Sequence, residues 1–254
     1  MNRFKKCLLA LSAMLLAIPP ASADWAPSQA EMAVLPAYCA AKFGESQHPE
    51  AAKVWRASMG SDFVHVHHYC AGLNFVNRAS AMTSQNKDRR GTLEAAVRNF
   101  DYMLVHTHPD FYLRPEILMN RGIALSMMNR TGEAVGDLLK SIEADPGQPR
   151  AYLALADLYE KQKNRAKALE TVTEGLRHNP DTKSLQRRYA ELGGKLPYPE
   201  PVAAEPAGSS VAKPDDPAAG QGAPAPGVTP PESGPSAEPK IGSPDNPYCR
   251  FCPD

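Results

Sequence analysis

The feature that most constrains this chain is an internal repeat. Two windows align without a gap at a spacing of 34 residues: RPEILMNRGIALSMMNRTGEAVGDLLKSIEADP from residue 114 and QPRAYLALADLYEKQKNRAKALETVTEGLRHNP from residue 148. The flanking prolines and the large and small residues between them recur in register: Pro115/Pro149, Leu118/Tyr152, Gly122/Ala156, Leu125/Tyr159, Ala134/Ala168, Leu138/Val172, Ser141/Gly175 and Pro146/Pro180. A repeat of this length is one supersecondary unit that buries its apolar face by stacking on its neighbours.

The pattern within each unit is typical of a helical hairpin. Small residues such as Gly122 and Ala134 let two antiparallel helices approach closely, while the large residues fill the seam. These offsets resemble those of the tetratricopeptide repeat family, whose unit is 34 residues long. Arg121 stands where that family usually has Leu, and both units lack its aromatic residue in the second helix. The resemblance implies two units, at 115–148 and 149–182.

A third, divergent unit is predicted upstream, at about residues 65–109. His68, Gly72 and Phe75 have the relative offsets of Leu118, Gly122 and Leu125. The second helix of this unit is TLEAAVRNFDYMLVHTHPDF, and the polar segment SAMTSQNKDRRGT before it forms a longer loop.

A repeat array needs capped ends. We expect the opening cap in SQAEMAVLPAYCAAKF, bent at Pro36, and a closing helix at 183–194 that stops at Gly193 and Gly194. The predicted fold class is all-α, with antiparallel helical hairpins stacked as a short tetratricopeptide solenoid.

The first residues predict a secreted or periplasmic protein. Arg3, Lys5 and Lys6 precede an apolar run that ends before Ala21-Ser22-Ala23, the small-x-small pattern of a signal peptidase site. The run is shorter than the roughly 20 apolar residues that cross a bilayer. We therefore expect residues 1–23 to be a signal peptide, a mature chain that begins at Asp24, and no membrane span after cleavage.

Composition divides the mature chain into two parts. Residues 24–195 carry the apolar periodicity of a helical domain, whereas residues 196–254 are rich in Pro, Ala and Gly and end in a Cys-x-x-Cys motif. A segment with so few large apolar side chains cannot offset its chain entropy by burial. The sequence predicts an extended, disordered tail for residues 196–254.

Charge narrows the classes of partner. The leader holds three of the 28 Lys+Arg residues and none of the 28 Asp+Glu residues, so the mature chain carries 25 against 28. Proteins that hold nucleic acid usually present a basic stripe, and this sequence has none. We expect a protein partner rather than nucleic acid or an anionic membrane surface.

Four cysteines remain after the leader, and an even number in an oxidising compartment indicates disulfides. Three pairings of Cys39, Cys70, Cys249 and Cys252 are possible. We favour Cys39 with Cys70, because these residues lie on helices expected to be antiparallel neighbours, where a bridge would tie the opening cap to the first repeat.

The terminal NPYCRFCPD is harder to interpret. Pro253 stands where a haem attachment motif needs His, and the surroundings offer no strand before a thioredoxin-like helix. A zinc knuckle would need a second close pair of cysteines. A local or exchangeable disulfide, a partner-binding or redox-exchanging tag and a metal site all stay open for Cys249 and Cys252.

Two histidine clusters are weak candidates for a metal site. On a helix, His65 and His68 share a face, and His106 and His108 lie just before Pro109. If the divergent unit forms, both clusters lie at the same end of one hairpin. The alternative is a satisfied polar cluster, because the His-Glu-x-x-His pattern of zinc peptidases is absent. We therefore predict no metal and no cofactor.

Function follows from the resemblance, because tetratricopeptide proteins generally hold a segment of another polypeptide on the concave surface of their first helices. By resemblance, the residues of that surface are Glu116, Met119, Ile123, Ser126 and Met127 in one unit, Arg150, Leu153, Asp157 and Glu160 in the next, and Val66, Tyr69, Leu73 and Val76 in the divergent unit. Met and Leu at helical spacing are also typical of a core, and the charged residues are typical of a solvated face.

We predict a scaffold for a polypeptide partner in the periplasm or cell envelope, and no enzymatic activity, because no catalytic constellation or phosphate loop can be placed on these helices. Two alternatives are a redox or metal-handling accessory protein that uses the terminal cysteines or the histidines, and a factor that assembles an envelope complex.

Overall fold

The structure is a computed structural model that describes residues 26–202. These residues form helices and no strand, which confirms the predicted all-α class. The helices are α1 (Gln29–Met32), α2 (Ala37–Phe43), α3 (Pro49–Met59), the 3-10 helix η1 (Gly60–His65), α4 (Val66–Ala81), α5 (Arg89–His106), α6 (Arg114–Met127), α7 (Thr131–Ala144), α8 (Pro149–Lys161), α9 (Arg165–His178) and α10 (Lys183–Glu191). The predicted signal peptide and the terminal Cys249 and Cys252 lie outside the described residues.

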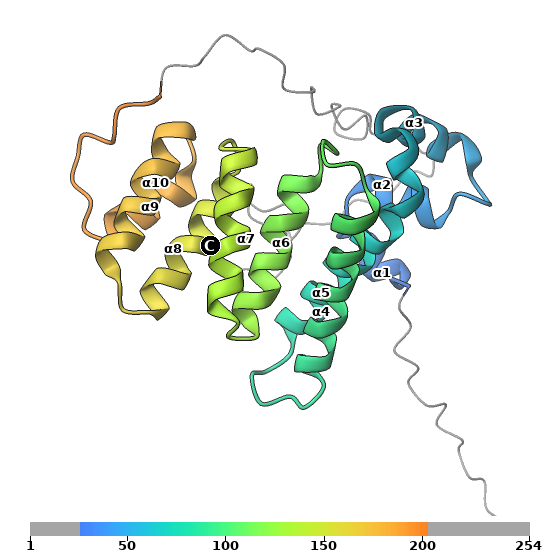
Figure 1. Cartoon of the computed structure of the whole chain (residues 1–254), viewed down its shortest axis with the longest axis horizontal. Helices are drawn as coiled ribbons and strands as arrows, with labels where there is room; N and C mark the ends of the chain where they lie inside the picture. Colours follow the sequence, from blue (N-terminus) through green and yellow to red (C-terminus); the bar gives the residue numbers. More distant parts are fainter. Residues whose placement is uncertain (1–25, 203–254) are drawn as a thin grey trace, which may run out of the picture.

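Three helical hairpins stack side by side. In Figure 1 the pairs α4–α5, α6–α7 and α8–α9 follow one another across the molecule, with α10 at one end and α1 to α3 at the other. The first helices also contact one another, α4 with α6, α6 with α8, and α8 with α10. The structure therefore has the stacked arrangement that a tetratricopeptide solenoid requires.

The turn inside each regular unit repeats in atomic detail. Asn129 and Lys163, 34 positions apart, both have a positive φ, of 61° and 58°. Each turn is closed by a backbone bond back into the first helix, from Arg130 N to Leu125 O and from Asn164 N to Tyr159 O, both 2.9 Å. These are helix-ending bonds of the kind that satisfy the last carbonyls of a helix.

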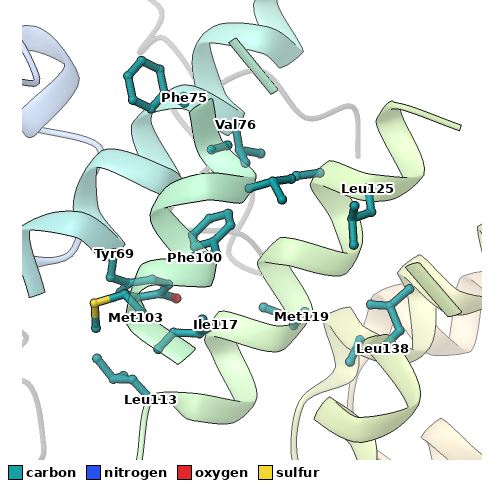
Figure 2. Close-up of a cluster of buried hydrophobic side chains, with 14 of the residues drawn as sticks. Tyr69, Phe75, Val76, Phe100, Met103, Leu113, Ile117, Met119, Leu125 and Leu138 are labelled. Carbon is teal, nitrogen blue, oxygen red and sulfur yellow. The ribbon is translucent and has the colours of Figure 1, made fainter. Parts of the chain in front are cut away.

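The close approach of the paired helices depends on small residues opposite large ones. A Cβ built at Gly72 would lie 2.5 Å from the Phe100 ring, and one at Gly122 would lie 2.9 Å from Leu138 Cγ. Both glycines are therefore required by packing. Figure 2 shows Phe100 lying with Tyr69, Met103 and Ile117 in the core where α4, α5 and α6 meet.

A disulfide joins the opening helices to the first hairpin. Cys39 of α2 and Cys70 of α4 are bonded and completely buried, which confirms the favoured pairing. Pro36 lies at the break between α1 and α2. The Arg78 guanidinium of α4 holds the Glu31 carboxylate of α1 through bonds of 2.5 and 2.8 Å. The opening cap is thus fixed on α4 covalently and by charge.

The other end is closed by α10. Leu185 and Leu192 are buried, and Gly193 follows the helix with a φ of 89°. Residues 196–202 lie beyond the predicted domain boundary, yet they return along the domain. The Tyr189 hydroxyl donates to Lys195 O at 3.2 Å, and Val202 N donates to Arg177 O at 2.9 Å.

Candidate functional site

The predicted partner-binding residues lie on adjacent first helices, but they are not equally accessible. We use the term first-helix face for the solvent-exposed part of this set. Its residues are Leu73 of α4, Glu116, Ile123, Ser126 and Met127 of α6, and Arg150, Leu153, Asp157 and Glu160 of α8, all partly or fully exposed. Val66, Tyr69, Val76 and Met119 are buried instead.

Burial corrects the assignment of Tyr69. The ring is 1% exposed and packs against Tyr38 of α2 and Phe100 of α5, with ring centroids 6.4 and 5.9 Å away. The Tyr69 hydroxyl donates to the Glu116 carboxylate at 3.3 Å and accepts from the Asn120 amide at 3.0 Å.

Burial raises the pKa of Tyr69 well above its ordinary value. Because α2 packs on α4 at this point, the divergent unit presents little of its first helix to a partner. Met119, 4% exposed, is likewise a core residue rather than a contact.

The opposite end of the first-helix face is tied to the closing helix. Arg188 of α10 donates to Asp157 at 2.6 Å and to Glu160 at 2.5 Å. Arg165 also pairs with Glu160, at 3.4 Å. Two predicted contact residues of α8 therefore already have a partner within the chain.

Arg188 was not predicted as part of the site, although a signal was present. Continuing the 34-residue register beyond Pro180 places Arg188 at the position of Ala154 and Asn120. Asn120 reaches back to the preceding first helix at Tyr69. The same register therefore directs Arg188 back to α8.

The apolar residues of the first-helix face that keep some exposure on the two regular units lie on α6 and α8. Ile123, Met127 and Leu153 are partly buried against the core, so each keeps some apolar surface toward solvent. Glu116 and Arg150 lie near the beginning of the same two helices and carry opposite charges. This mixture suits a partner segment with both apolar and charged side chains.

The structure brings the two histidine clusters together at the η1–α4 junction and the end of α5. The rings of His65 and His106 have centroids 5.8 Å apart. Tyr102, which sequence analysis missed, stacks with His106 and lies tilted against His68, with centroid distances of 3.8 Å in each case. Its position four residues before His106 was the available signal, since such a pair shares a helix face.

Hydrogen bonds fix most of these rings. His65 Nδ1 lies 3.2 Å from the Tyr102 hydroxyl, His68 Nδ1 lies 2.9 Å from Asn99 Oδ1, and His106 Nδ1 lies 2.8 Å from the Tyr102 carbonyl oxygen. Burial is the main cause that lowers the pKa values of His65 and His67, and neighbouring imidazoles add to it. For His108, the backbone N–H donates to the Asp62 carboxylate at 3.1 Å.

Two features are absent from the part of the chain that the structure describes. Within residues 26–202, no three His, Cys, Asp or Glu side chains surround one point as a metal site would need. No helix in that same range is long and apolar enough to cross a membrane.

Comparison with known families identifies the repeat. Residues 125–192 match the tetratricopeptide repeat, and this match spans the end of α6, all of α7, α8 and α9, and α10. None of the curated proteins matches the chain. Tetratricopeptide repeats generally mediate protein–protein interaction. With the hairpins stacked at 34-residue spacing, the match shows that residues 125–192 form tetratricopeptide repeats.

Proposed function

We propose that the protein is a non-catalytic scaffold that holds a segment of another polypeptide against the first-helix face of α6 and α8. The observation that carries the proposal is the partly exposed apolar set of Ile123, Met127 and Leu153 on two stacked first helices. Met127 and Leu153 lie within the residues that match the tetratricopeptide repeat. Stacked repeats create extended surfaces of this kind for partners.

The same features favour a short partner segment. The packing of α2 on α4 covers Tyr69, and α10 engages Asp157 and Glu160 through Arg188. The first helices that remain accessible to a partner are therefore mainly α6 and α8. An extended peptide advances about 3.3 Å per residue, so the 8 to 10 Å between neighbouring helix axes corresponds to roughly three residues. The two helices together therefore face roughly six residues of the partner.

We further propose that this happens in the periplasm or cell envelope after removal of residues 1–23. The buried Cys39–Cys70 disulfide supports an oxidising compartment, and the basic and then apolar start of the chain supports export. Mass spectrometry of protein isolated from the envelope should find Asp24 as the first residue. A chain that starts at Met1 in the cytoplasmic fraction would contradict export.

Site-specific photocrosslinking in the full chain tests the binding surface. A crosslinker at Leu153 of α8 should capture one defined polypeptide, whereas a crosslinker at Lys140 of α7 or Glu170 of α9, both exposed on second helices, should not. A peptide from the captured region should then bind the purified protein.

Substitutions on the face supply the second test. Ile123→Ala and Leu153→Ala should each weaken binding of that peptide by about 5- to 30-fold, equal to roughly 1–2 kcal/mol. Equal capture from first and second helices, or unchanged binding by both variants, would rule out this surface.

A further inference from the structure

A histidine cluster that takes no part in the proposed binding surface lies at the end of the α4–α5 hairpin. It consists of His65, His68, His106 and the ring of Tyr102, drawn from three elements that meet only in the folded chain. His106 is exposed and His65 is partly buried, so solvent reaches the pair.

The hydrogen bonds select one tautomer of the ring at His106. Its Nδ1 lies 2.8 Å from the Tyr102 carbonyl oxygen, which can only accept, so Nδ1 must carry the proton. In the neutral imidazole, the lone pair is then on Nε2. Metal-binding histidines in proteins are held in this way, with the other ring N–H donated to a carbonyl, carboxylate or similar oxygen.

His65 has a comparable partner. Its Nδ1 lies 3.2 Å from the Tyr102 hydroxyl, which can accept from the Nδ1–H and leave Nε2 as the ligating nitrogen. Tyr102 stacks on His106 with 14° between the ring planes. One tyrosine thus holds both imidazoles, one through its hydroxyl and one through its ring and backbone.

The separation of the rings suits a shared ion. Zinc–imidazole bonds of about 2.0–2.1 Å place the centroids of two rings on one tetrahedral ion about 5 Å apart. The centroids of His65 and His106 are 5.8 Å apart. The observed separation therefore exceeds that of a shared ion by less than about 1 Å.

We propose that His65 and His106 form a solvent-accessible site for a borderline divalent metal ion, Cu²⁺ or Zn²⁺. Imidazole is a preferred ligand of both ions. With only two protein ligands, water fills the remaining coordination positions. Such a site binds its ion in exchange with solvent, unlike a closed structural site.

Cu²⁺ titration of the full chain, with its thiols alkylated beforehand, tests the proposal. Electron paramagnetic resonance should detect one Cu²⁺ per chain with two nitrogen ligands. His65→Gln and His106→Gln should each lower the association constant at least tenfold. His178→Gln is the matched control, because His178 is a partly exposed helical histidine near the end of α9 that pairs with Glu174, and it should bind Cu²⁺ like the original protein.

Two results would overturn the site. One is an association constant that changes less than twofold in both His65→Gln and His106→Gln. The other is an equal loss in His178→Gln, which would indicate nonspecific binding to histidines. Circular dichroism checks that each variant is folded, and if His65→Gln unfolds the protein, the exposed His106→Gln decides the question.

Discussion

Arg121 shows how a single residue can depart from its family and still be accommodated. Its guanidinium pairs with Asp101 of α5 at 2.7 Å and with Asp137 of α7 at 3.0 Å, so it joins three helices. The Asp137 side chain is only 9% exposed, and burial raises the pKa of its carboxyl. The family's usual Leu at position 121 would leave this buried carboxylate without its ion-pair partner.

The second unit shows which residues could replace the Arg121–Asp137 pair in a test of its contribution to stability. Leu155 and Thr171 occupy the positions equivalent to Arg121 and Asp137. Arg121→Leu should lower the free energy of unfolding by about 2–4 kcal/mol, because it strands a buried charge. Arg121→Leu with Asp137→Thr should recover most of that loss. Urea unfolding followed by circular dichroism measures both, and a double variant no better than the single one would contradict this account.

At the scale of elements, the two helices of each hairpin approach closely at one crossing, and a different pair of residues meets there in each hairpin. Gly72 faces Phe100 and Gly122 faces Leu138, while the equivalent positions in the last unit hold Ala156 and Val172, both buried. Where the second-helix residue is Val instead of Phe or Leu, the first-helix residue is Ala instead of Gly. At a close-packed crossing, a larger residue on the first helix needs a smaller one on the second.

This pairing predicts that a second substitution can restore the stability lost through a first one. Gly122→Ala gains up to about 1 kcal/mol of helix propensity, but overpacking against Leu138 costs about 1–3 kcal/mol. We expect a net destabilisation of about 1–2 kcal/mol. Adding Leu138→Val reproduces the pair of the last unit and should restore stability in thermal or urea unfolding. Failure of the second change to help would show that the backbone, not Leu138, sets the limit.

The attachment of α1 to α4 should depend on pH. The hydrogen bonds from Arg78 lower the pKa of Glu31 from 4.5 to about 2. Because the pKa is lower in the folded state, the pair stabilises the fold above pH 4.5 and loses this contribution as the pH falls toward 2. After allowance for solvent screening, we expect a contribution of about 1 kcal/mol.

Glu31→Gln isolates that contribution. The variant should be less stable than the original protein at pH 6, and the difference in free energy of unfolding should shrink as the pH approaches 2. Glu50→Gln, which removes an exposed carboxylate of α3, is the control for loss of a charge. A difference that stays constant from pH 6 to pH 2 would show that Glu31 acts through packing alone.

At the scale of the whole molecule, both ends of the solenoid are closed by elements outside the regular repeat. The Cys39–Cys70 bond ties the opening helices to α4 across 31 positions of sequence, a loop for which chain-entropy arguments give about 3–4 kcal/mol of stabilisation. At the other end, α10 is followed by residues 196–202, whose Tyr198 ring packs on Tyr189 with centroids 6.0 Å apart.

Truncation tests where the folded domain ends. A chain that stops after Val202 should unfold at the same urea concentration as the full chain, because the sequence predicts an extended tail beyond it. A chain that stops after Lys195 should lose about 1 kcal/mol, since it lacks the Tyr198 contact and the bond from Val202 N to Arg177 O. Equal stability of the two chains would place the domain end at Lys195.

Sequence alone determined the class and register of the fold. The prolines, small residues and large residues spaced at 34 are local requirements of a helical hairpin, so they can be read without knowing what the hairpin packs against. The Cys39–Cys70 pairing was also accessible, because it follows from placing two helices as neighbours.

Only the tertiary structure decided which residues of the first helices reach solvent. Tyr69 and Leu73 lie four positions apart on one helix, yet Tyr38 of α2 packs against Tyr69 while Leu73 is only partly buried. In the same way, α10 brings Arg188 to Asp157 and Glu160, and Tyr102 gathers His65 and His106. Helical periodicity specifies the face on which a side chain lies, whereas burial and pairing depend on elements distant in sequence that pack on that face.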